Sequence, residues 1–126
     1  MHLADKHATV SFDDRQEPAV IRVTGDIDSF CASQVRERFA DAVGAGAVLV
    51  DIREVRFVDS AGLGALVGGI RRVREAGGAV AMCCTRPNVR RLISMTGFDR
   101  IVVVASTPAK ARAAIASQTG SRAGVG

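Results

Sequence analysis

Short apolar runs rich in β-branched residues alternate along the chain with longer stretches in which apolar residues recur every three or four positions. The short runs predict five β-strands, at residues 8–12, 19–24, 47–52, 79–84 and 101–104. Only the polar stretch DDRQEP separates the first two runs, which is typical of a hairpin connection and predicts an antiparallel pair. Helical patterns separate the later runs. They predict crossover connections and a parallel sheet that is buried on both faces.

Four helices are expected, and each has a recognisable beginning or end. They cover residues 31–43, 60–76, 87–96 and 108–117. Gly44, Gly77 and Gly97 follow the first three helices, and Thr107 is the expected N-cap of the fourth. The pattern therefore predicts one α/β domain over residues 8–116, with about four helices and a mixed, mostly parallel five-stranded sheet.

The two ends of the chain are expected to lie outside this domain. Residues 1–7 form an N-terminal segment, and residues 117–126 are expected to be a flexible tail because TGSRAGVG has no apolar periodicity. No apolar run reaches the roughly 18 residues that a membrane helix requires, and Asp5 and Lys6 interrupt the place of an export signal. We therefore expect a cytoplasmic protein with no membrane partner.

The cysteines and the charges indicate no special chemistry. Cys31, Cys83 and Cys84 lack a CxxC spacing and are expected to be reduced and mostly buried. Histidine occurs only at His2 and His7, so no metal site is expected. The net charge of +4 comes from arginines. Because Trp and Tyr are absent and no nucleic-acid motif occurs, solvated helix faces explain these arginines better than nucleic-acid binding does.

The most unusual passage is VRFVDSAGLGALVGG, where an apolar strand ends at Val58 and a helix begins. Partners of parallel α/β sheets gather at such strand ends. Ser60 can be a simple N-cap, whose hydroxyl accepts an amide hydrogen bond worth ~1 kcal/mol. Glycine costs about 0.5–1 kcal/mol in a helix, however. Gly62 and Gly64 could leave bare backbone for another surface to approach Ser60, and Gly68 and Gly69 could allow close packing on the sheet.

Enzyme motifs do not fit this passage. A nucleophile elbow would need glycine in place of Val58 and a histidine later in the chain. Gly62, Gly64 and Gly68 nearly imitate a dinucleotide fingerprint, but the last glycine is one position late. No glycine is followed by lysine and then serine or threonine, as a phosphate-binding loop requires. We therefore expect no catalytic residue and no cofactor, and we interpret Ser60 as a serine presented to another protein.

Three passages occur in a fixed order: GDID at residues 25–28, FVDSAGLGAL at 57–66, and RRL at 90–92 followed by TGF at 96–98. In these passages the chain resembles the STAS-domain family, specifically the bacterial anti-sigma-factor antagonists, over nearly all of residues 8–116. The resemblance implies that Ser60 is the phosphorylated serine and that Asp28 and Asp59 lie near it.

The partners are also implied by the resemblance. The unphosphorylated antagonist would bind an anti-sigma factor that is a serine kinase and so release its sigma factor, and a serine phosphatase would reverse the modification. The implied contact surface contains Asp26, Asp28, Asp59, Ser60, Ala61, Gly62, Leu63 and Gly64.

Several alternatives remain open at this point. Cys31 stands where the family often has threonine, a departure expected to alter a helix cap. Asp26 and Asp28 also fit as loop acids ahead of a helix N-terminus. Leu63 belongs either to the apolar stripe of its helix or to an exposed contact surface. The whole chain can also be a constitutive interaction or scaffold module that has no phosphorylation cycle.

Overall fold

The computed structural model describes residues 8–125, with side chains up to residue 118. The expected strands and helices are present in the expected order. The elements are β1 (Thr9–Asp13), β2 (Ala19–Ile27), α1 (Ala32–Ala42), β3 (Ala47–Val58), α2 (Ser60–Glu75), β4 (Ala79–Cys83), α3 (Pro87–Thr96), a 3₁₀ turn η2 (Phe98–Arg100), β5 (Val103–Ala105) and α4 (Pro108–Val125). The segment 1–7, with both histidines, lies outside the described residues.

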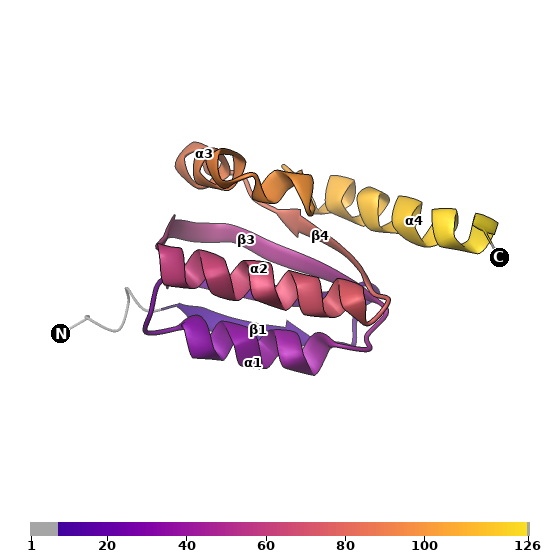
Figure 1. Ribbon diagram of the computed structural model, residues 1–126, viewed down its shortest axis with the longest axis horizontal. Helices are drawn as coiled ribbons and strands as arrows, with labels where there is room; N and C mark the ends of the chain where they lie inside the picture. The colour runs from indigo at the N-terminus through magenta and orange to yellow at the C-terminus, as the bar shows by residue number, and fades with distance from the viewer. Residues whose placement is uncertain (1–7, 126) are drawn as a thin grey trace.

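The sheet has the predicted mixed topology. Its strand order is β1-β2-β3-β4-β5, and each strand lies beside the next one in the chain. β1 pairs antiparallel with β2, and the other three pairings are parallel. The connection DDRQEP is therefore a hairpin connection, as predicted. The carboxyl ends of the parallel strands lie together at one end of the sheet (Figure 1).

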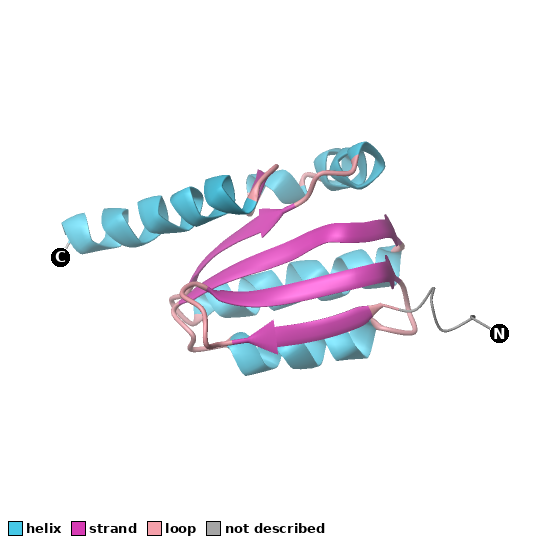
Figure 2. Cartoon of the chain, turned by 180° about the vertical axis from the view of Figure 1, so that it is seen from behind, coloured by secondary structure: helices cyan, strands magenta, loops and turns pink. Residues whose placement is uncertain are grey.

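Helices cover the two faces of the sheet unequally. α1 and α2 lie side by side on one face (Figure 1), where the large apolar side chains of the main core gather, among them Phe39, Leu66 and Ile70. α4 packs on the other face against β3, β4 and β5. Seen from behind, no helix lies over β1, β2 and the carboxyl-terminal half of β3 (Figure 2). The expectation of a parallel sheet buried on both faces holds for β4, whose five residues are all buried, and for residues 48–52 of β3. It is wrong for the carboxyl-terminal half of β3, where Glu54, Arg56 and Phe57 are exposed.

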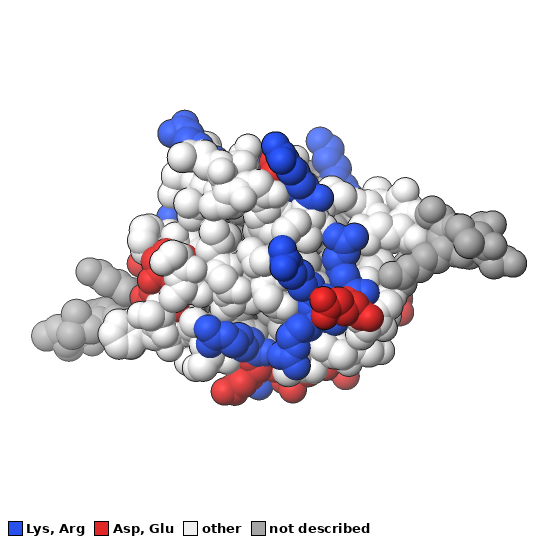
Figure 3. All heavy atoms as spheres, viewed as in Figure 1, with Lys and Arg blue, Asp and Glu red and all other residues white. Residues whose placement is uncertain are grey.

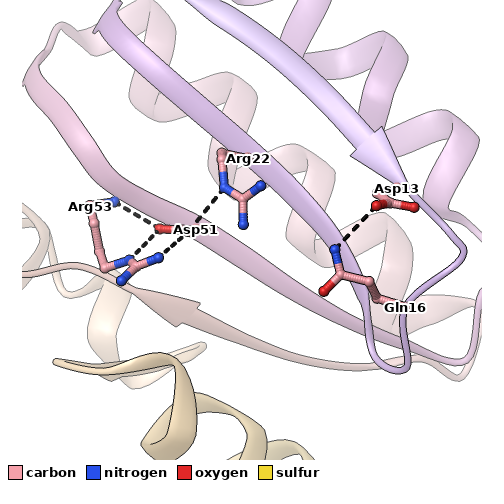
Figure 4. A network of polar contacts seen from close by, with 5 residues as sticks. All are labelled: Asp13, Gln16, Arg22, Asp51 and Arg53. Carbon is pink, nitrogen blue, oxygen red and sulfur yellow. Dashed lines mark hydrogen bonds and ion pairs between the residues drawn. The ribbon is translucent and has the colours of Figure 1, made fainter.

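A buried carboxylate lies on this second face. Asp51 of β3 is only 4% exposed. Its Oδ1 and Oδ2 accept hydrogen bonds from Arg53 Nε and Nη2 at 3.0 and 2.9 Å, and Oδ2 also accepts one from Arg22 Nε at 3.2 Å. Figure 4 shows the carboxylate between the two guanidinium groups. It also shows Asp13, the last residue of β1, which accepts a hydrogen bond from Gln16 of the hairpin loop. Pairing with two cations makes the burial of Asp51 tolerable.

Several element boundaries differ from the predictions: β2 runs on to Ile27, β5 covers only Val103–Ala105, and β3 and α4 differ most. β3 is one continuous strand to Val58, because register shifts against β2 let polar residues point outward without ending it. α4 does not stop near Ser117. The Gln118 side chain bonds both Val80 N and Val80 O, at 3.1 and 3.0 Å, which holds the helix to β4 beyond that point. The domain boundary at residue 116 remains a prediction.

Candidate functional site

The GDID and FVDSAGLGAL passages meet at the carboxyl ends of β2 and β3. Ile27 pairs with Val58 at the end of the parallel ladder. The Asp59 amide then donates a 3.0 Å hydrogen bond to the Ile27 carbonyl. This contact joins the turn after β2 to the first residues of α2, so the residues predicted from the two motifs lie at one end of the molecule.

Asp59, and not Ser60, is the N-cap of α2. The Asp59 backbone is extended, and its Oδ1 accepts a 2.7 Å hydrogen bond from Gly62 N. Interpreting Ser60 as a simple N-cap is therefore wrong, since the serine is already the first helical residue. Ser60 is exposed, and its hydroxyl has no hydrogen-bond partner among residues 8–118. The Ser60 side chain, which the sequence indicates as a phosphate acceptor, therefore makes no hydrogen bond in the helix cap.

The glycines of α2 differ in what surrounds them. A Cβ on Gly62 would lie 2.4 Å from the Ile27 carbonyl oxygen, so Gly62 is needed for packing within this chain rather than for the approach of a partner. Gly64 is exposed and has no neighbour within 4 Å of the position of a Cβ, as expected for a bare contact surface. Gly69 accommodates the Phe39 ring of α1, not the sheet, and Gly68 faces open space.

The turn between β2 and α1 is held by Asp28 and Cys31. Asp28 Oδ1 accepts a 3.0 Å hydrogen bond from Phe30 N. The buried Cys31 thiol accepts a hydrogen bond from Asp28 N at 3.3 Å and lies within donating distance of the Asp26 and Asp28 carbonyls. Burial raises the pKa of the Cys31 thiol, and the Asp28 carboxylate raises it further, which keeps the thiol protonated. Cys31 is the N-cap of α1 and makes no side-chain cap bond to the helix, and the expectation that it alters the cap stays a prediction.

Three carboxylates surround this end of the molecule. Asp26, Asp28 and Asp59 are all partly exposed, and none of them forms an ion pair with a described Lys or Arg side chain. Figure 3 shows acidic side chains at the end where α2 begins, while basic side chains gather farther along the helical face. Arg71, Arg72 and Arg74 of α2 are exposed there, as predicted for a solvated helix face. A charge added at Ser60 would therefore enter a negative region.

The apolar residues at this end complete the surface. Leu63 is partly buried and packs against the main core, but part of its side chain remains open, so burial does not remove it from the surface. Ala61 is also half-buried. Phe57, which sequence reasoning singled out only as part of a motif, is 52% exposed and lies opposite Asp26 in the β2–β3 ladder. Because Val58 points into the core, the alternation of a strand turns Phe57 outward.

Metal-binding clusters, membrane-spanning helices and disulfides are absent from the described residues. Among them, no group of three His, Cys, Asp or Glu side chains could hold a metal ion. None of the helices within the described chain is long and apolar enough to cross a membrane. All three cysteines are buried and unpaired, as predicted.

Residues 9–111 match the model of the STAS domain. The chain belongs to the STAS-domain family. A search of curated proteins found no match. Among solved structures, this STAS domain is similar to an anti-sigma factor antagonist from Mycobacterium paratuberculosis, at 25% identity and a TM-score of 0.77, with 87% of this chain and 95% of that chain covered.

The chain is also similar to two solved structures of the anti-sigma factor antagonist SpoIIAA, one without phosphate and one with phosphate. Its unphosphorylated form has 22% identity and a TM-score of 0.69, over 89% of this chain and 97% of that chain. Its phosphorylated form, described as a Bacillus cell fate determinant, has 22% identity and a TM-score of 0.63, over 82% and 96% of the two chains. These likenesses show the α/β STAS fold and a resemblance to anti-sigma factor antagonists.

Proposed function

We propose that this STAS domain is a cytoplasmic anti-sigma-factor antagonist, not an enzyme, and that phosphorylation of Ser60 switches its binding. Without phosphate, the domain binds an anti-sigma factor that is also a serine kinase, and the sigma factor is released. A serine phosphatase restores the unmodified form. The observation that carries this proposal is the exposed Ser60 hydroxyl, which stands at the first position of a helix that Asp59 caps in its place.

The phosphoryl transfer requires parts that the partner supplies. The Ser60 Oγ forms a bond to the γ-phosphorus of ATP held by the kinase, the bond from that phosphorus to the bridging oxygen breaks, and ADP leaves. The hydroxyl proton passes to a base of the kinase. A loose transition state of this kind depends mostly on positioning and on compensating charge. An exposed serine on a capped helix provides the positioning on the side of the acceptor.

The effect of the phosphate follows from its surroundings. The free amides at the start of α2 favour an anion, so the modified domain stays folded. In a complex, however, a phosphate with nearly two negative charges would be desolvated beside Asp59 and close to Asp28, where like charges repel. The surface of Asp26, Asp28, Asp59, Ser60, Ala61, Leu63 and Gly64 would then lose its partner. Gly62 supports this surface by packing on Ile27.

The position of the phosphate tests the proposal. The domain is incubated with a candidate anti-sigma kinase and ATP, and the modified residue is located by mass spectrometry of proteolytic fragments. We expect phosphate at Ser60 and none on Ser60→Ala. Phosphate on Ser60→Ala, for instance at Ser29 or Ser33, would place the switch elsewhere. A partner that binds equally well before and after ATP treatment would favour the constitutive scaffold.

A further inference from the structure

A groove lies between α3 and the last strand of the sheet, and it shares no residue with the Ser60 surface. Its volume is about 740 Å³. One wall is a single face of α3, and the other is β5 with the turn before it. The lining includes Thr85, Arg90, Arg91, Asp99, Val103 and Val104. Such a groove beside a helix is large enough to hold several residues of an extended chain.

The wall formed by β5 is the open edge of the sheet. β5 is the last strand in the sheet order, and no strand among the described residues pairs with its outer side. The Cys84 amide donates a 2.9 Å hydrogen bond to the Ala105 carbonyl, so the backbone groups of Ala105 face β4. Backbone groups alternate in direction along a strand. The N–H and C=O of Val104 therefore point away from β4, toward the open edge.

The walls of the groove determine which chain can pair there. Arg90 is fixed by a 2.8 Å hydrogen bond from its Nη1 to the Cys84 carbonyl, and Arg91 is exposed on the next position of the helix. Asp99 is the only acidic residue among those named as lining the groove. Val103 is 48% exposed on the side of the strand opposite Val104. An extended chain would meet positive charge on one side and apolar surface on the other.

We propose that this groove binds an extended acidic segment of a partner protein, which adds to β5 as a sixth strand. The Val104 N–H and C=O would form two main-chain hydrogen bonds with the segment, as in other cases of strand addition. Acidic side chains of the segment would face Arg90 and Arg91, and apolar side chains at alternate positions would lie on Val103. This gives the domain a second binding surface that Ser60 does not control.

A model peptide tests the proposal on the full chain. Fluorescein-labelled Glu-Val-Glu-Val-Glu-Val is titrated with the protein, and binding is measured by fluorescence polarisation. We expect at least about tenfold tighter binding than for Lys-Val-Lys-Val-Lys-Val, because like charges would oppose the lysines. A peptide that is N-methylated at alternate amides keeps its side chains but loses main-chain donors. It should also bind at least about tenfold more weakly.

Matched protein variants locate the site. Arg91→Glu should weaken binding of the glutamate peptide about tenfold, whereas Arg71→Glu, an equal change on the exposed face of α2, should leave it unchanged. Ser60→Asp should also leave it unchanged, so this test is independent of the proposed switch. Equal effects of Arg91→Glu and Arg71→Glu, or equal binding of both peptides, would overturn the proposal. So would sedimentation showing that wild type is a dimer and Arg91→Glu a monomer, because the groove would then bind a second copy of this chain.

Discussion

The carboxylate of Asp59 caps α2 through Gly62 N at 2.7 Å, in the place that the neighbouring Ser60 side chain would otherwise take. Adjacent residues of this turn therefore have different roles. Asp59 accepts the hydrogen bond that caps the helix, and the Ser60 side chain is exposed. The Ser60 side chain can be modified without loss of the cap.

Substitutions at these two positions should affect stability differently. Ser60→Ala should change the free energy of unfolding by less than about 0.5 kcal/mol, because it removes no cap bond. Asp59→Ala should cost about 0.5–2 kcal/mol, the usual loss for a capping side chain. Urea unfolding followed by circular dichroism measures both values. A larger loss for Ser60→Ala than for Asp59→Ala would assign the cap to the serine after all.

Alanine substitutions at the two glycines of the first turn of α2 should also have different effects on stability. Gly62→Ala forces a Cβ to 2.4 Å from the Ile27 carbonyl and should cost about 1–3 kcal/mol or more, since backbone on both sides must move. Gly64→Ala meets open space and should stabilise the helix by about 0.5–1 kcal/mol. Thermal unfolding of the two variants gives the comparison. If both lowered the midpoint equally, the close approach to Ile27 would not be what requires Gly62.

The sequence predicted the elements because their signals are local. Pro87 and Gly97 bound α3 at the predicted residues, and the polar loop after β1 forms the antiparallel hairpin. The cap was misassigned because aspartate and serine are both good N-caps, and a pattern does not locate a helix start to one residue. Gly62 is required because of Ile27, and the buried Asp51 has Arg22 as its second cation beside Arg53. Ile27 and Arg22 both lie on β2, far away in sequence, and only the sheet register brings them near.

The buried carboxylate of Asp51 should make stability depend on pH. Burial alone would raise the pKa of Asp51, but hydrogen bonds from Arg53 and Arg22 outweigh it and hold the pKa below its usual value. Because the pKa is lower in the folded state than in the unfolded chain, this stabilisation is complete above pH of about 4 and is lost as the pH falls through the native pKa. Asp51→Asn should cost about 1–3 kcal/mol at pH 7, and the deficit should shrink in acid.

Urea unfolding of wild type and Asp51→Asn at pH 7 and pH 3 checks this dependence. Asp41→Asn is the matched control, because Asp41 pairs with Arg38 on the surface, where its side chain is 52% exposed. It should cost less than about 1 kcal/mol at either pH. A deficit of Asp51→Asn that stayed constant between the two pH values would mean that the charge of Asp51 does not stabilise the fold.

The central claim is that negative charge at Ser60 weakens binding without disturbing the domain. Ser60→Asp places a carboxylate at the start of α2, where the helix dipole favours it, so the unbound fold should be unchanged. In the complex the same charge would be desolvated beside Asp59 and near Asp28. An imperfectly paired buried charge costs several kcal/mol, and each ~1.4 kcal/mol is tenfold in affinity.

Titration calorimetry of wild type and Ser60→Asp against the same anti-sigma factor tests this claim most directly. Ser60→Ala serves as the control for loss of the hydroxyl and should bind within about threefold of wild type, since it adds no charge to the contact surface and leaves the cap intact. We predict that Ser60→Asp binds at least about tenfold more weakly, with an unchanged circular dichroism spectrum. Equal dissociation constants for wild type and Ser60→Asp would contradict the switch and leave the domain as a constitutive binding module.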